Sequence, residues 1–346
     1  MGVALTDSQR FKPSVKDGSK RRKLSERELY KAKVLTSSRL ARYLGTTTDK
    51  LRKFILEWKA AGVVFAPDIS LAKLGLKRVC VEIDRRIDMN KLAEQPEVRA
   101  VAKTYPDRII AFIEQPMDRK IPSYGYGWKT LFTVINSVRR RPRKEDIKAA
   151  LDGKWMELLQ ALPKYLSKKP DLEFDLYDIK PAKFDWVDLE ILDICTMDLL
   201  IPYKPLVHYL RKERGVRFTT HVDVHIRHAE NLISGYYVKK IGKREGLIGF
   251  FRSYDKKFLN TITNPVVGGV GLGEYGGLII QVKIIRKDLW FEIVDFMSTL
   301  GAEALAVVDA SRMRVFGVGR RGAMYNPVNR WESVRSIDEI IRAASG

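Results

Sequence analysis

Cysteine and histidine are scarce in this 346-residue chain, which holds two cysteines and four histidines. Cys80 and Cys195 each lie in an apolar run, and the sequence has no CxxC pair of the kind that a zinc ribbon needs. Two buried thiols in a reducing cytoplasm are the simplest interpretation of this pattern. The cysteines therefore favour neither a disulfide scaffold nor a zinc ribbon.

Long apolar runs are also missing. No stretch approaches the roughly 18 consecutive apolar residues of a membrane-spanning helix, and the N-terminus lacks the apolar segment of a signal peptide. The GGVGLG run at residues 268–273 lies between expected strands and opens no helix, so it is not a dinucleotide fingerprint. No P-loop, paired carboxylate or Ser/His/Asp constellation is visible. The sequence thus predicts no membrane partner, no cofactor and no enzymatic activity.

Three of the four histidines fall close together in the sequence, at His221, His225 and His228. Their i, i+4 and i+3 spacing places them on one face of a helix. A metal site there would need a cysteine or carboxylate partner. Asp223 and Glu230 are near in sequence but share no obvious face with the histidines, so no metal is predicted.

Positive charge is present in excess. The chain has 63 lysines and arginines against 42 acidic residues, a formal net charge of +21. Cationic side chains release the counterions condensed on phosphates, so this excess is typical of polyanion-binding proteins. Nucleic acid is the predicted partner. An anionic membrane surface and a generally charged, soluble surface are the alternatives.

The stretch over residues 37–83 has the element order of a winged helix-turn-helix that leads into a second module. Two short helices precede a turn at Gly45, and Thr48 is a favourable N-cap for a helix over residues 49–61. Residues 63–65 and a strand near Leu71 would then form the wing. This order predicts a nucleic-acid-reading head.

The run LARYLGTTTDKLRKFILEWKAAGVV, followed by FAPDISLAKLGLKRVCVEI, resembles the Lrp/AsnC (feast/famine) regulators. Members of that family begin with a winged helix-turn-helix, and a linker with an LGL-type motif leads into a βαββαβ ligand-sensing domain. Leu74-Gly75-Leu76 stands where that motif belongs, and Phe54 stands where the family usually has an arginine. The resemblance implies DNA reading by the third helix and small effectors, typically amino acids, at contacts between sensing domains.

The second half of the chain repeats this plan. FDWVDLEILDI, at residues 184–194, resembles the opening helix of the same regulators, and helices are expected over residues 205–211 and 220–231. Residues 246–309 then follow a βαββαβ order, and GEYGGLIIQV resembles the family's hairpin with Gly276 in place of an aspartate. The two sensing domains could pair within one chain, and a further homodimer through these ferredoxin-like domains is possible.

The connection between the halves is less regular. WKTLFTVI is expected to be a strand, and a helix within residues 155–166 is expected to be the last helix of the first βαββαβ unit. Residues 172–179 would close that unit, which makes residues 116–154 an insertion. Arginines mixed with Tyr325 and Trp331 near the C-terminus either contact nucleic acid or pack on the domain surface.

The predicted fold class is α+β, with two winged helix-turn-helix domains alternating with two ferredoxin-like βαββαβ domains. The predicted order is a basic disordered arm (1–24), the first winged helix-turn-helix (25–70), the first ferredoxin-like domain with an insertion (71–183), the second winged helix-turn-helix (184–244), the second ferredoxin-like domain (245–313) and a basic C-terminal tail (314–346).

The predicted function is a cytoplasmic transcription regulator of Lrp/AsnC type that reads duplex DNA. A basic RNA- or ribosome-binding factor is the alternative. The sirohaem decarboxylases share the two-module plan, but their His/Arg-bearing tetrapyrrole pocket has no clear match at the second hairpin. The candidate nucleic-acid-binding residues are Thr47, Thr48, Lys50, Arg52, Lys53, Lys59, Thr219, Thr220, His221, His225, Arg227, Lys239, Lys240, Lys243, Arg244, Arg320 and Arg321.

Overall fold

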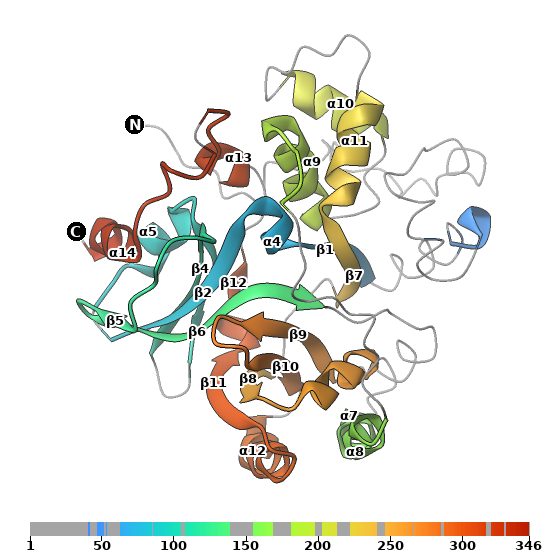
Figure 1. The fold of residues 1–346 in the computed structure, drawn as a ribbon, viewed down its shortest axis with the longest axis vertical. Helices are drawn as coiled ribbons and strands as arrows, with labels where there is room; N and C mark the ends of the chain where they lie inside the picture. Colours follow the sequence, from blue (N-terminus) through green and yellow to red (C-terminus); the bar gives the residue numbers. More distant parts are fainter. Residues whose placement is uncertain are drawn as a thin grey trace, which may run out of the picture.

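The computed structural model shows a mixed α+β fold with a mostly antiparallel sheet, which confirms the predicted class at that level (Figure 1). The structure describes residues 41, 47–51, 53, 63–84, 86–104, 108–138, 155–168, 181–197, 203–212, 222–240, 246–264, 266–284, 287–315, 320–328 and 330–345. Over these ranges, no helix has both the length and the apolar character needed to cross a membrane.

One large antiparallel sheet organises the described residues. Its strands are β2 (Leu76–Ile83), β3 (Val98–Lys103), β4 (Ile109–Pro116), β5 (Tyr124–Gly125), β6 (Trp128–Val138), β8 (Leu247–Ser253), β9 (Val267–Gly273), β10 (Leu278–Ile284), β11 (Glu303–Asp309) and β12 (Arg314–Val315). They lie in the order β11-β8-β10-β9-β6-β2-β4-β3-β12, and β5 pairs with β6. The two halves of the chain thus share one sheet.

The junction between the halves is the pairing of β6 with β9, which runs from Val134 opposite Gly273 to Val138 opposite Val270. At the far ends of the strand order, a bridge between Thr104 and Val308 joins the β3 side to β11. The bridge brings the two ends of the strand order together, and apolar side chains from both halves form one buried cluster between the strands.

Three phenylalanines from three strands belong to that cluster. The rings of Phe112, Phe132 and Phe250 lie 5.2–6.4 Å apart between centroids, in tilted and edge-on arrangements that aromatic rings favour. Because β4 and β6 come from the first half and β8 from the second, this cluster joins the halves through burial as well as through strand pairing.

Helices cover the outer faces of the sheet. On the first half, α5 (Met89–Glu94) and the C-terminal α14 (Ile337–Ser345) pack over β2, β3 and β4. On the second half, the helices are η1 (Lys256–Thr263), η2 (Lys287–Leu289), α12 (Trp290–Thr299), α7 (Trp155–Gln160) and α8 (Leu162–Leu166). Each half of the sheet is thus covered in part by helices that are distant in sequence from its strands.

This placement of the helices corrects the predicted arrangement of the first half. The helix expected over residues 155–166 packs on the second half, where Leu159 and Leu162 join the core around Phe258. The fourth strand of the first half is β6, inside the stretch predicted to be an insertion, while residues 172–179 lie outside the described ranges. Apolar contact decides this placement, which periodicity within one segment does not reveal.

A helical lobe lies beside the sheet. It contains α4 (Leu71–Leu74), α9 (Trp186–Met197), α10 (Tyr203–Lys212) and α11 (Val222–Asn231), with a two-stranded sheet of β1 (Val63–Ile69) and β7 (Ile233–Lys240). The strand expected near Leu71 is instead the short helix α4, because Ser70 caps its start and Gly75 ends it at φ +73°. The two predicted wings pair with each other.

The C-terminal segment packs against both the lobe and the sheet. After η3 (Ala310–Arg312), it forms α13 (Arg320–Met324) and then buries Trp331, whose Nε1 donates to the Leu74 carbonyl over 2.6 Å. The rings of Phe184 and Tyr325 lie 6.1 and 5.4 Å from the Trp331 ring. Of the two interpretations of this segment, packing on the domain describes Tyr325 and Trp331.

Candidate metal centre

The first turn of α9 fixes a carboxylate in place. Asp185 Oδ1 accepts hydrogen bonds from the backbone N–H groups of Val187 (2.9 Å) and Asp188 (3.1 Å). In return, Asp188 Oδ2 accepts from the Asp185 N–H over 2.9 Å. This reciprocal pair is a capping box built from two aspartates. It satisfies the free N–H groups at the helix start and holds the Asp188 carboxylate in one orientation.

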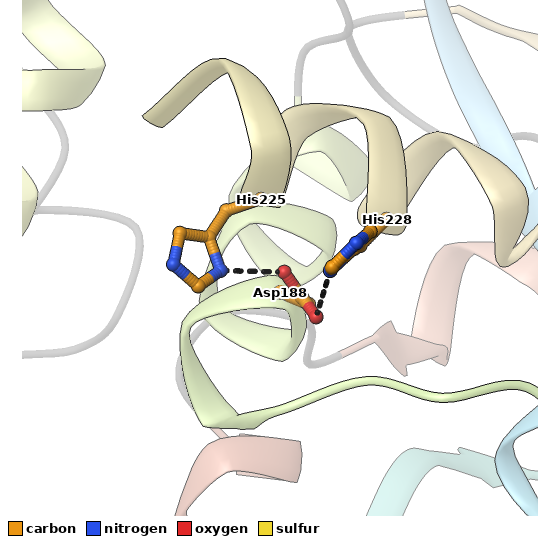
Figure 2. Close-up of side chains that lie close together, drawn as sticks. All are labelled: Asp188, His225 and His228. Carbon is orange, nitrogen blue, oxygen red and sulfur yellow. Dashed lines mark hydrogen bonds and ion pairs between the residues drawn. The ribbon is translucent and has the colours of Figure 1, made fainter. Parts of the chain in front are cut away.

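Two imidazoles from α11 face that carboxylate, as Figure 2 shows. His225 Nδ1 lies 2.9 Å from Asp188 Oδ1, and His228 Nδ1 lies 3.5 Å from Asp188 Oδ2. The i, i+3 spacing places both rings on the side of α11 that packs on α9. One potential ligand atom from each of the three residues lies within 4.8 Å of the others.

Exposure rises in steps across the cluster. The Asp188 side chain is 0% exposed, His225 is 20% exposed and His228 is 47% exposed. Burial raises the pKa of Asp188 above its ordinary value, and the charge of Asp185 adds to this, although hydrogen bonds from Asp185 and His225 oppose it. The cluster is therefore a desolvated carboxylate at its inner end with a solvent-facing imidazole at its outer end.

Two imidazoles and one carboxylate form a donor set that suits divalent transition metals. The same contacts also hold α11 against α9, so the cluster contributes to packing whether or not it binds an ion. The sequence placed His225 and His228 on one helical face, and the structure agrees. It did not identify Asp188, which lies 37 residues before His225. The available signal was the capping pattern in FDWVDLEILDI.

Ten of the 17 candidate nucleic-acid residues lie within the described ranges. Thr47, Lys50, Lys53 and Arg227 are exposed, and Thr48 is half-buried. The Thr47 hydroxyl accepts from the Lys50 N–H over 3.3 Å, so Thr47 rather than Thr48 caps that helix. Lys239 and Lys240 lie in β7, and Arg320 is the first residue of α13; only the backbone of these three residues is described. Outside the described ranges lie Arg52, Lys59, Thr219, Thr220, His221, Lys243 and Arg244.

Two candidates take part in internal contacts. His225 belongs to the cluster with Asp188. Arg321 is buried, and its guanidinium donates to both carboxylate oxygens of Glu114 and to Asp193 over 2.7–3.0 Å. A guanidinium in such a network faces protein carboxylates rather than solvent.

Comparison with known proteins gives a limited set of similarities. No family model matches the sequence, and no curated protein matches it. Two similar solved chains are crystal structures of the siroheme decarboxylase NirDL, one of them in co-complex with an iron-uroporphyrin III analogue. Each is 12% identical, and the match covers 83% of this chain and 90% of that chain, with TM-scores of 0.41 and 0.38.

These findings correct the predicted family and function. The predictions of an Lrp/AsnC transcription regulator and of a chain without enzymatic activity are wrong on this comparison, because the similar solved chains are those of an enzyme. The alternative of an RNA- or ribosome-binding factor gains no support either. Decarboxylation of siroheme is the activity that the name of those proteins gives.

Proposed function

We propose that this protein binds a divalent transition-metal ion, with Zn²⁺ as the first candidate, through Asp188, His225 and His228. The observation that carries the proposal is a fully buried carboxylate that faces two imidazoles at a helix junction. A buried carboxylate is costly unless positive charge or hydrogen bonds compensate it. A bound divalent cation would supply that charge and would use nitrogen and oxygen donors already close together.

We further propose that the bound ion is catalytic. Structural zinc sites usually have four protein ligands, whereas catalytic sites have three and leave a position for water or substrate. Among the residues that the structure describes, the donor set has three members, and His228 connects it to solvent. Bound there, the ion would act as a Lewis acid and lower the pKa of a coordinated water to about 7. Metal-assisted hydrolysis is the reaction class that this arrangement supports best.

Isothermal titration of the metal-free protein with Zn²⁺, Co²⁺ and Fe²⁺ tests the binding. We expect one ion per chain for the preferred metal. His225→Ala and His228→Ala should each weaken binding at least tenfold, since losses of about 10–100-fold follow even from changes outside the ligand set. His208→Ala is the matched control, because His208 is exposed on α10. Wild-type protein without a bound ion, or ligand variants with wild-type affinity, would overturn the proposal.

The visible spectrum of the Co²⁺-loaded protein tests the open position. Addition of azide or acetohydroxamate should shift the d–d bands, because an exogenous ligand can occupy a site with three protein donors. A spectrum unchanged by either ligand would indicate a closed structural site. That result would refute the catalytic role and leave metal binding intact.

We also propose that the chain alternates two winged helix-turn-helix modules with two ferredoxin-like modules. In support, the strand orders β11-β8-β10-β9 and β6-β2-β4-β3 both read 4-1-3-2 when each half is numbered along the chain. The α9, α10, α11 and β7 order matches one helical module with its wing. In the first half, α14 would take the place of the second helix. A crystal structure with another strand order in either half would contradict this arrangement.

A further inference from the structure

We propose that Asp185 positions the candidate metal centre, and that its carboxylate charge strengthens cation binding beyond its part in capping α9. This inference rests on the proposed metal binding and adds a residue that donates no ligand. Asp185 contacts both the carboxylate and one imidazole of the cluster. Its backbone N–H donates to Asp188 Oδ2 over 2.9 Å, and its Oδ1 lies 3.5 Å from His225 Nδ1.

The backbone link gives Asp188 a hydrogen-bond donor behind its carboxylate. Carboxylates that bind metals are commonly held by such donors, which keep the oxygen atoms in a fixed direction. Here the donor is the N–H of the residue that caps the same helix, so the start of α9 and the orientation of Asp188 are parts of one hydrogen-bonded unit.

The second contribution of Asp185 is the negative charge of its carboxylate. The Asp185 side chain is 48% exposed, and its carboxylate is close to a second carboxylate that is fully buried. Two neighbouring negative charges repel each other, and both carboxylates lie within 3.5 Å of the same nitrogen, His225 Nδ1. A divalent cation would relieve the repulsion. A second carboxylate with an oxygen 3.5 Å from His225 Nδ1 therefore favours cation binding even without direct coordination.

Capping and charge can be separated by mutation. Asparagine caps helices about as well as aspartate, because its side-chain oxygen accepts the same N–H bonds, whereas alanine accepts none. Asp185→Asn therefore removes the charge and keeps the cap, and Asp185→Ala removes both. Asp88 provides the matched control, since it caps α5 by accepting from the Asn90 N–H over 2.7 Å, and α5 packs with β3 and α14.

The test measures the Zn²⁺ dissociation constant and the melting temperature of the metal-free protein for the wild type, D185N, D185A and D88A. We expect D185N to melt near the wild type and to bind Zn²⁺ about tenfold more weakly. D185A should show weaker binding together with a lower melting temperature, whereas D88A should lower the melting temperature alone.

Wild-type affinity in D185N would overturn this inference and leave the metal site standing, because Asp185 would then act only as a helix cap. A D88A variant that weakens Zn²⁺ binding as much as D185N would also overturn it, since the effect would then follow from stability in general. Wild-type protein that binds none of the tested ions would overturn the proposed function first, and this inference with it. The wild-type titration alone distinguishes the two failures.

Discussion

Glu114→Gln should destabilise the protein strongly, because one buried carboxylate is paired with three arginines. Glu114 on β4 accepts from Arg321 through both oxygens, from Arg99 over 2.7 Å and from Arg78 over 3.0 Å. Asp193 on α9 shares Arg321. The network therefore ties the sheet, the helical lobe and the C-terminal segment together. Its side chains are almost wholly buried, except that of Arg78, which is 29% exposed.

The size of the effect follows from what the substitution leaves behind. Glutamine has nearly the shape of glutamate but carries no charge, and its amide N–H groups would face guanidinium donors. Removing one partner of a buried ion pair costs about 3–5 kcal/mol, because the remaining charge stays desolvated and uncompensated. With three arginines dependent on Glu114, we expect the free energy of unfolding to fall by at least about 3 kcal/mol.

The same contact predicts a pH dependence. Burial alone would raise the pKa of Glu114, but the charges of Arg321, Arg99 and Arg78 outweigh it and hold that pKa well below the usual range. A carboxylate with a depressed folded-state pKa stabilises fully above its unfolded-state pKa, about 4.3, and loses this contribution as the pH falls toward the folded value. The difference between wild type and Glu114→Gln should therefore shrink as the pH drops below about 4.

Urea denaturation at several pH values measures both effects. Glu82→Gln is the control, because Glu82 also faces two cations, Arg108 and Lys129, whose side chains are more than half exposed. Surface ion pairs contribute about 0–1 kcal/mol, so this control should lose little stability. Similar losses for the two variants, or a Glu114→Gln deficit that does not change with pH, would refute the reasoning about buried charge.

Three further substitutions test the packing. Gly271→Ala should cost about 1–3 kcal/mol in urea denaturation, because the added Cβ would come 2.7 Å from Val134 Cγ1 where β9 meets β6. Ile340→Ala should cost about 2–5 kcal/mol, since this fully buried α14 side chain lies in the core of the first half, and a loss below 1 kcal/mol would show that α14 is dispensable. Trp331→Phe should cost about 1–3 kcal/mol by leaving the Leu74 carbonyl without its indole donor, and differential scanning calorimetry would detect an unchanged melting temperature if that bond is unimportant.

The strands of both halves were better suited to sequence-based prediction than the placement of the helices that cover the sheet. The four strands expected within residues 246–309 correspond to β8, β9, β10 and β11, because each is a short apolar run between turns. The helices that follow β6 in the sequence, α7 and α8, pack on the second half of the sheet. The first half is covered by α5 and by α14, which lies near the C-terminus. Local periodicity identifies a helix and its apolar face but not the sheet that will bury it.

The basic C-terminal segment shows what a count of charges leaves out. Lysine and arginine are mostly exposed in proteins, so an arginine-rich stretch suggests a solvated surface. Arg321 departs from this rule because buried acidic partners come from β4 and α9, which are more than 100 residues away in the chain. The net charge of +21 describes the whole chain and does not indicate which cations already have partners inside the fold.

The candidate metal centre could be predicted only in part, for a related reason. Helical spacing brings His225 and His228 to one face, because residues three apart are neighbours on a helix. The third member, Asp188, comes from a helix that packs across from them, so its distance depends on how α9 and α11 meet. The capping pattern of α9 does place a carboxylate at the helix start, where α11 passes. A search that pairs histidines spaced i, i+3 with capping-box carboxylates on neighbouring helices would therefore find sites of this kind that a search of one segment misses.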